Sequence, residues 1–98
     1  MSEEKHFVTA LARGLQILGC FSRERPALAM ADIVKMTGLS QPTVWRLCFT
    51  LRQTGHLEQG SEGGFVRLGP ASLLLGVAAT SESVFTESLR GKLLALAQ

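Results

Sequence analysis

The chain lacks three features that would assign it to common protein classes. No apolar run in its 98 residues approaches the roughly 20 residues that cross a membrane. The N-terminal residues 1–5 are polar and acidic, unlike a secretory leader. The only two cysteines, Cys20 and Cys48, have no histidine near them in the sequence, so they do not form a zinc-binding motif. We therefore expect a cytoplasmic protein without membrane contacts, whose cysteines are reduced and buried.

Charge is also scarce in this sequence. Charged residues make up 18% of the chain and hydrophobic residues 46%, which excludes a disordered tail and indicates one small globular domain. The net charge is +2, and the pI of 8.8 is just below the value of about 9 that marks an obvious nucleic-acid-binding domain. Overall charge therefore does not show whether the chain binds nucleic acid, and this question depends on the positions of the basic residues.

The sequence has no arrangement of residues that is typical of an enzyme. It contains no Ser/His/Asp set, no paired carboxylates and no phosphate-binding loop. The pair Gly63 and Gly64 lies between two predicted strands rather than between a strand and a helix, so it is not a nucleotide-binding loop. We predict a protein that is not an enzyme and that holds no cofactor and no metal.

The first predicted helix is apolar on two sides. It begins with Thr9 as its N-cap and runs to about Phe21. One line of side chains consists of Val8, Leu11, Leu15 and Leu18, and the other consists of Ala10, Arg13, Ile17 and Cys20. A helix that is apolar on two sides must be covered on two sides. Either both lines pack inside the domain, or one of them meets a second subunit.

Two further helices are predicted to be joined by a tight turn. The first spans about residues 31–37 and ends at Gly38, which supplies the left-handed conformation of a helix C-cap. Ser40 is a good N-cap for the next helix, which runs from Gln41 to about Thr54. This order of helix, glycine-containing turn and helix is typical of a helix-turn-helix, here at about residues 30–54.

A hairpin signal follows the helix-turn-helix. Residues 56–59 and 65–68 are predicted to be short strands around a glycine-rich turn at 60–64, with a register that the sequence leaves open. Gly69 and Pro70 open a leucine-rich helix, and a last apolar stripe consists of Val84, Phe85, Leu89, Leu93 and Leu96. The expected fold is mainly α with a small β-hairpin: a winged helix-turn-helix followed by linker helices.

The predicted helix at 41–54 has a buried face and a free face. Val44, Leu47, Cys48 and Leu51 form the buried stripe. The free face begins with residue types that contact base edges and phosphates, and the start of the helix offers unpaired N–H groups to a phosphate. The expected DNA contacts, with one residue from the returning strand, are Ser40, Gln41, Pro42, Thr43, Trp45, Arg46, Thr50 and Arg67. Trp45 and Phe49, bulky and near this face, either pack on the wing or another helix or mark a contact with a protein.

Several segments, in order, resemble IclR-type (isocitrate lyase regulator type) bacterial transcription regulators. They are residues 12–18, residues 37–40 followed by 43–47, and residues 55–59 with 67–70. The resemblance implies a dimeric repressor or activator whose DNA-facing helix corresponds to residues 40–50, with Thr43 and Arg46 in its usual positions. The wing tip departs from the family, because it carries Glu62 and glycines instead of a basic residue.

The resemblance also implies a domain organisation. Residues 1–69 would form the DNA-binding domain, with the wing at about 56–68. Residues 70–98 would form linker helices that lead to an effector-binding domain absent from this chain, so we expect a fragment of a longer protein. A small-molecule effector would bind that C-terminal domain.

Uncovered apolar surface predicts a homodimer. Three short helices and a hairpin cannot cover all the apolar residues of the first helix and of the helices after Pro70, and monomers rarely leave large apolar patches in water. The expected dimer contacts are Ala10, Ile17, Leu74 and Val77. Alternatively, the missing second domain covers the last helix and the remaining apolar residues fold back inside the domain.

The function predicted from the sequence is that of a sequence-specific, DNA-binding transcription regulator. It would bind double-stranded DNA as a dimer, with the helix at about 41–54 in the major groove. The sequence also allows two alternatives. One is a winged helix that binds protein instead of DNA, and the other is a winged-helix sensor of another family, such as a metal or multidrug sensor.

Overall fold

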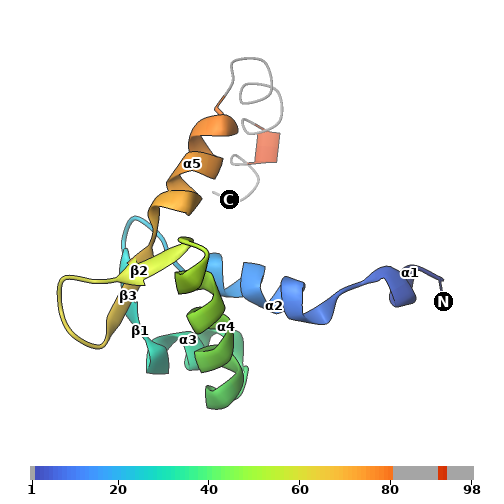
Figure 1. Cartoon of the computed structure of the whole chain (residues 1–98), viewed down its shortest axis with the longest axis horizontal. Coiled ribbons are helices and arrows are strands. Elements are labelled where there is room, and N and C mark those ends of the chain that lie inside the picture. The colour runs from blue at the N-terminus through green and yellow to red at the C-terminus, as the bar shows by residue number, and fades with distance from the viewer. Residues whose placement is uncertain (1, 81–90, 93–98) are drawn as a thin grey trace.

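A computed structural model describes residues 2–80 and 91–92 of the chain. Figure 1 shows a body of three helices and a small sheet, from which one short helix extends at the N-terminal end and another helix extends beyond the sheet. The elements are α1 (Ser2–His6), α2 (Thr9–Leu18), β1 (Ala27–Ala29), α3 (Met30–Thr37), α4 (Gln41–Gln53), β2 (Leu57–Gln59), β3 (Phe65–Leu68) and α5 (Pro70–Ala78). The mainly helical fold predicted from the sequence is confirmed, and α1 is an element that the sequence pattern did not indicate.

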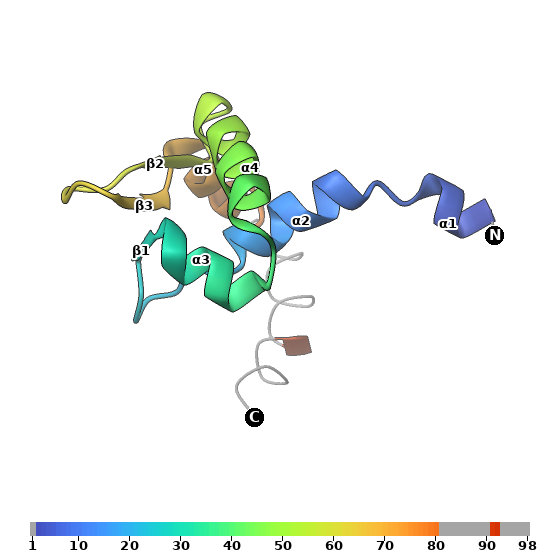
Figure 2. The ribbon, with the colours of Figure 1, turned by 90° about the horizontal axis from the view of Figure 1, so that it is seen from below.

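The sheet has three strands rather than the two of the predicted hairpin. It is antiparallel, with β3 in the centre between β1 and β2. Leu28 of β1 lies opposite Val66, and Leu57 of β2 lies opposite Leu68. Leu28, Val66 and Leu57 are buried on the inner face, whereas Leu68 is 43% exposed. Figure 2 shows the β2–β3 hairpin projecting on the side of the body opposite α1. The strand β1 thus anchors the hairpin to the segment between α2 and α3.

The core draws one or two side chains from nearly every element of the body. Its buried members are Ile17, Leu28, Ile33, Val44, Cys48, Leu57 and Val66. Burial of aliphatic side chains of this size contributes about 1.5–3 kcal/mol each, so this cluster dominates the stability of the domain. The predicted inward face of α4 is confirmed at its centre, where Val44 and Cys48 have no exposed area, while Leu47 and Leu51 at its edges are half-buried.

The assignment of Ile17 as a dimer contact is wrong. Its side chain is 0% exposed and lies in the core between α2 and its neighbours. The line that faces solvent is the other one, where Val8, Leu11 and Leu15 are 61%, 63% and 58% exposed. Gly14 is buried on the same side as Ile17, so this side of α2 faces the body of the domain.

The boundaries of two helices also differ from those predicted. The helix α2 ends at Leu18 rather than near Phe21, and its N-cap position is Val8, which makes no side-chain capping bond, rather than Thr9. The helix α3 begins one residue before the expected start. Its first turn is capped from within, because the Asp32 carboxylate accepts a hydrogen bond from the Ala29 backbone N–H at 3.0 Å.

Close backbone contacts fix the start of α5 to the end of α4. The N–H of Gly69 donates to the His56 carbonyl at 2.8 Å, and the N–H of Ala71 donates to the Gly55 carbonyl at 2.9 Å. The Ser72 hydroxyl donates to the same His56 carbonyl at 2.9 Å. A Cβ atom at position 69 would lie 2.3 Å from the Gly55 carbonyl oxygen, so only glycine fits there.

The helix α5 begins at Pro70 as predicted and exposes its leucines. The predicted apolar stripe at 84–96 lies outside the described residues. Within residues 2–80 and 91–92, none of the helices combines the length and the hydropathy that a membrane span requires.

Candidate nucleic-acid interface

The turn between α3 and α4 has the geometry that its sequence predicts. Gly38 adopts a φ of 74°, the left-handed conformation expected for this helix C-cap, and its N–H donates to the Val34 carbonyl at 2.9 Å. The Thr37 hydroxyl donates to the Ile33 carbonyl at 2.7 Å and accepts from the Leu39 N–H at 3.2 Å. These bonds fix the direction in which α4 leaves α3.

The start of α4 is capped by Ser40, as predicted. The Ser40 Oγ accepts a hydrogen bond from the Thr43 N–H at 3.4 Å and donates one to Thr43 Oγ1 at 2.9 Å. Gln41 and Pro42 occupy the first helical positions and are exposed. Because an α-helix leaves its first N–H groups without intrahelical partners, this exposed end favours an anion such as a phosphate.

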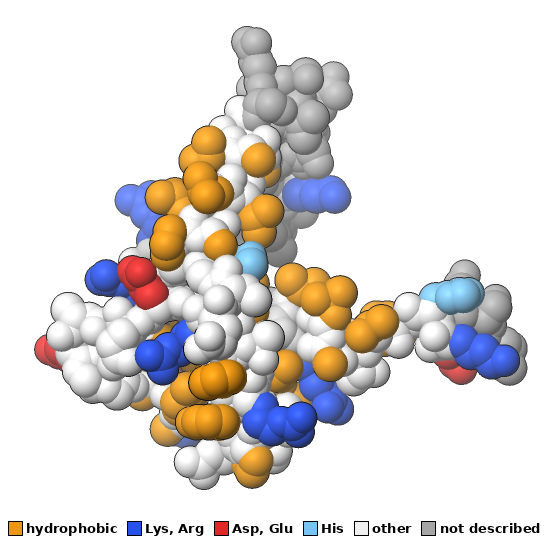
Figure 3. All heavy atoms as spheres, in the orientation of Figure 1, with side chains coloured by type: hydrophobic (Ala, Val, Ile, Leu, Met, Phe, Trp, Pro, Cys, Tyr) orange, Lys and Arg blue, Asp and Glu red, His pale blue; other side chains and the backbone are white. Residues whose placement is uncertain are grey.

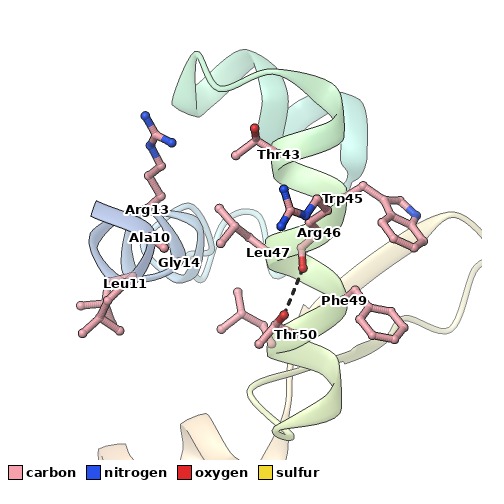
Figure 4. Close-up of a pocket in the computed structure, with 12 residues that line it drawn as sticks. Ala10, Leu11, Arg13, Gly14, Thr43, Trp45, Arg46, Leu47, Phe49 and Thr50 are labelled. Carbon is pink, nitrogen blue, oxygen red and sulfur yellow. Dashed lines mark hydrogen bonds between the residues drawn. The ribbon is translucent and has the colours of Figure 1, made fainter. Parts of the chain in front are cut away.

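The outward face of α4 combines basic, polar and aromatic side chains. Arg46 and Thr50 are exposed, and the Thr50 hydroxyl donates to the Arg46 carbonyl at 3.2 Å (Figure 4). Trp45 and Phe49 lie on the side of α4 away from α2, where their rings stack with centroids 5.6 Å apart (Figure 4). Figure 3 shows hydrophobic and basic side chains next to one another at the lower end of α4.

An open groove of about 710 Å³ separates α2 from this face of α4. Arg13 of α2 and Arg46 of α4 both line it, and they are the only charged residues in its lining (Figure 4). Two guanidinium groups at one groove, without a carboxylate among the lining residues, favour a negatively charged ligand. Arg13 is absent from the residues expected to contact DNA. One signal in the sequence could have identified it, because Arg13 is a charged residue within an otherwise apolar line of α2.

The wing offers less positive charge than its sequence suggests. Arg67, on β3, donates from Nε to Oε2 of Glu58 on β2 at 2.7 Å. The two residues are direct partners across the strands. The structure therefore gathers seven of the eight expected DNA contacts on α4 and its cap, and it places the eighth on another element with its charge already paired.

Neither cysteine takes part in this surface. Cys48 is buried beneath α4, and burial raises the pKa of its thiol to about 11, with a further contribution from Cys20 that outweighs the opposing effect of Arg52. Burial also raises the pKa of the half-buried Cys20 thiol. Both are free thiols in their protonated form at neutral pH.

Comparison with known proteins gives consistent matches. The family model of the IclR helix-turn-helix domain matches residues 10–61. The chain is 39% identical over 62 residues to the HTH-type transcriptional regulator XynR of Escherichia coli, covering 63% of this chain and 25% of that protein. It is 41% identical over 71 residues to the HTH-type transcriptional regulator TsaQ1/TsaQ2 of Comamonas testosteroni, covering 72% of this chain and 25% of the relative. The chain thus spans about a quarter of the length of these curated relatives.

Solved structures agree with the sequence matches. An IclR family transcriptional regulator from Brucella abortus superposes with a TM-score of 0.76 at 41% identity, over 87% of this chain and 33% of the other. An IclR homologue from Microbacterium sp. strain HM58-2 gives a TM-score of 0.67 at 31% identity, over 72% of this chain and 29% of the other. The family model covers more than half of the chain, and the fold is that of a winged helix-turn-helix, so the chain belongs to the IclR family of transcription regulators.

Proposed function

We propose that this domain binds double-stranded DNA in a sequence-specific manner, with α4 in the major groove, as part of a transcription regulator. The observation that carries the proposal is the outward face of α4. It presents Gln41, Thr43 and Arg46 next to a helix start that is exposed and capped by Ser40. An α-helix fits the major groove, and these residue types form the usual contacts with base edges and phosphates.

Two guanidinium groups have distinct roles in this proposal. Arg46 lies on the outward face of α4, where it either binds a guanine through two hydrogen bonds or holds a phosphate. Arg13 faces the same groove from α2, where its guanidinium group would hold a phosphate of the DNA backbone. The wing contributes little, because Arg67 is bound to Glu58. One copy of the domain therefore makes few charged contacts.

We further propose that two copies bind together, which doubles the number of phosphate contacts. The apolar line of Val8, Leu11 and Leu15 is exposed on α2, and α5 exposes further leucines (Figure 3). Of the contacts expected from the sequence, Ala10, Leu74 and Val77 are exposed and stay in the proposed interface. Leu11 and Leu15 take the place of Ile17.

The domain organisation is part of the same proposal. Residues 1–69 form the DNA-binding domain, and the segment from residue 70 links it to an effector-binding domain that takes a small molecule. The greater length of the curated relatives supports this division, because the chain covers only 25% of each of them.

The experiment is a gel mobility shift of labelled duplex DNA at several salt concentrations. Specific binding should appear first with duplexes selected from a random pool, and the affinity should fall linearly with salt on logarithmic axes as counterions are released. An exposed aromatic pair on α4 favours one rival function, a domain that binds protein instead of DNA. Failure to retain any duplex even at low salt would support that rival and refute the proposal.

A further inference from the structure

Trp45 and Phe49 form an exposed aromatic pair on the outward face of α4. Their side chains are 58% and 50% exposed, and the two rings stack with an angle of 15° between their planes. Exposed apolar area of this size is unfavourable in water unless a partner covers it. Among the described residues, the hydrophobic core, which includes Ile17 and Val44, contains neither ring.

The surroundings of the pair indicate the chemistry of that partner. Arg46 lies beside it on the same helix, and α4 carries no acidic residue along its length (Figure 4). An apolar patch beside a guanidinium group matches the edge of an A·T base pair within a negatively charged duplex. The thymine C5-methyl group is the apolar feature that the major groove displays. A purely apolar protein partner would leave the neighbouring Arg46 charge uncompensated.

The spacing of the pair also fits a duplex. Trp45 and Phe49 are one helical turn apart, which corresponds to about 6 Å along the axis. Adjacent base pairs are stacked about 3.4 Å apart along the duplex. Two rings at this spacing therefore cover about two consecutive base-pair steps.

We infer that Trp45 and Phe49 select thymine at two positions of the DNA site, about two base-pair steps apart, through contact with the thymine C5-methyl groups. This inference rests on the proposed function, because it requires α4 to lie in the major groove. It makes the pair a determinant of specificity rather than a source of general affinity. The neighbouring Arg46 supplies the charged contact, and the rings supply the apolar recognition that a guanidinium group does not provide.

The test removes single methyl groups from the DNA. A duplex is selected from a random pool with the full chain, and each thymine in it is replaced in turn by deoxyuridine, which pairs identically and lacks only the methyl group. Replacement at a contacted position should weaken binding about fourfold, the affinity that burial of one methyl-sized group provides. Replacement at both positions should weaken it roughly 15-fold.

Protein variants then connect the methyl groups with the aromatic pair. Binding by Trp45→Ala and by Phe49→Ala should respond less to deoxyuridine than binding by the wild type. The control variant Met36→Ala, at an exposed apolar residue of α3, should respond as the wild type does. Circular dichroism checks that each variant is folded, and Phe49→Leu provides a milder change at the same site.

The binding results distinguish a failure of the inference from a failure of the proposed function on which it rests. Equal affinity for the thymine and deoxyuridine duplexes would overturn the inference and leave DNA binding established. An equal deoxyuridine effect in the wild type and in the aromatic variants would also overturn it, because other residues would then read the methyl groups. If no duplex is selected at all, the proposed function fails, and the inference fails with it.

Discussion

Arg67 and Glu58 face each other across the two strands of the wing, and the Arg67 Nε donates to the Glu58 Oε2 at 2.7 Å. Arg67 is the only basic residue between positions 57 and 68. The single positive charge of the wing is therefore paired with a carboxylate. A wing that contacts DNA through a free basic side chain differs in this respect.

We predict that Glu58→Gln strengthens DNA binding by releasing Arg67. Both side chains are largely exposed, so loss of the pair should lower the free energy of unfolding by less than about 1 kcal/mol. The dependence of affinity on salt should steepen by about one phosphate contact. The control is Glu62→Gln, which removes the same charge from the exposed wing tip. An equal gain in both variants would show that net charge, and not the release of Arg67, causes the effect.

Arg46→Ala should weaken specific DNA binding without unfolding the domain. The Arg46 side chain is exposed, so its removal leaves no cavity. Loss of a bidentate contact with a base should cost about 1–3 kcal/mol of binding free energy, measured by titration of a selected duplex. Arg46→Lys keeps the charge and loses the bidentate geometry. A lysine variant that binds as tightly as the wild type would assign Arg46 to a phosphate, and unchanged binding by the alanine variant would refute its placement in the groove.

Gly38→Ala should destabilise the fold through the backbone alone. A Cβ atom at position 38 would meet no atom within 4 Å, so the cost arises from its φ of 74° and should be about 1–2 kcal/mol. Gly38→Val should cost more, since a β-branched residue resists this conformation further. Urea denaturation measures both changes. Gly63→Ala is the matched control, because that glycine also has open space around it and its φ is not positive. Equal stability of the alanine variants at 38 and 63 would contradict the predicted strain.

The buried Cys48 thiol should make the stability depend on pH in the alkaline range. Its pKa in the folded protein is about 11, above the ordinary value of 9.0, so the folded state holds the proton more tightly than the unfolded state. The stabilisation is complete below pH 9 and is lost as the pH rises towards 11, at a cost on the order of 2 kcal/mol. Urea denaturation at several pH values measures this loss. A Cys48→Ala variant should show a shallower decline over the same range, and a decline as steep as that of the wild type would count against the buried thiol as its source.

Substitutions in α2 should separate the core from the proposed dimer contact. Ile17→Ala should lower the free energy of unfolding by about 2–5 kcal/mol, as for other aliphatic residues with no exposed area. Leu11→Glu should leave the fold intact and shift the mass measured by ultracentrifugation from dimer to monomer, because Leu11 is exposed. Ser61→Glu adds the same charge at the wing tip and serves as the control. A wild type that is monomeric at tens of micromolar would refute the dimer.

Local signals in the sequence were sufficient for the turn and for α4. Gly38 and Ser40 act within a few residues of their own positions, so their roles could be read without the rest of the fold. The strand β1 could not be predicted, because three residues without alternation become a strand only by pairing with β3 far along the chain. The sequence pattern also did not indicate which face of α2 is buried. Both of its lines are apolar, so their spacing alone does not show which line packs against the core.

The joint between Gly55 and Gly69 has a mechanical consequence. Three hydrogen bonds and a backbone contact too close for any side chain connect the end of α4 with the start of α5. The connection between α4 and α5 is therefore rigid and does not act as a hinge. A torque applied to α5 either breaks these bonds or turns the C-terminal end of α4 with it. The helices α5 and α4 should therefore move together as one rigid unit that is joined at Gly55 and Gly69.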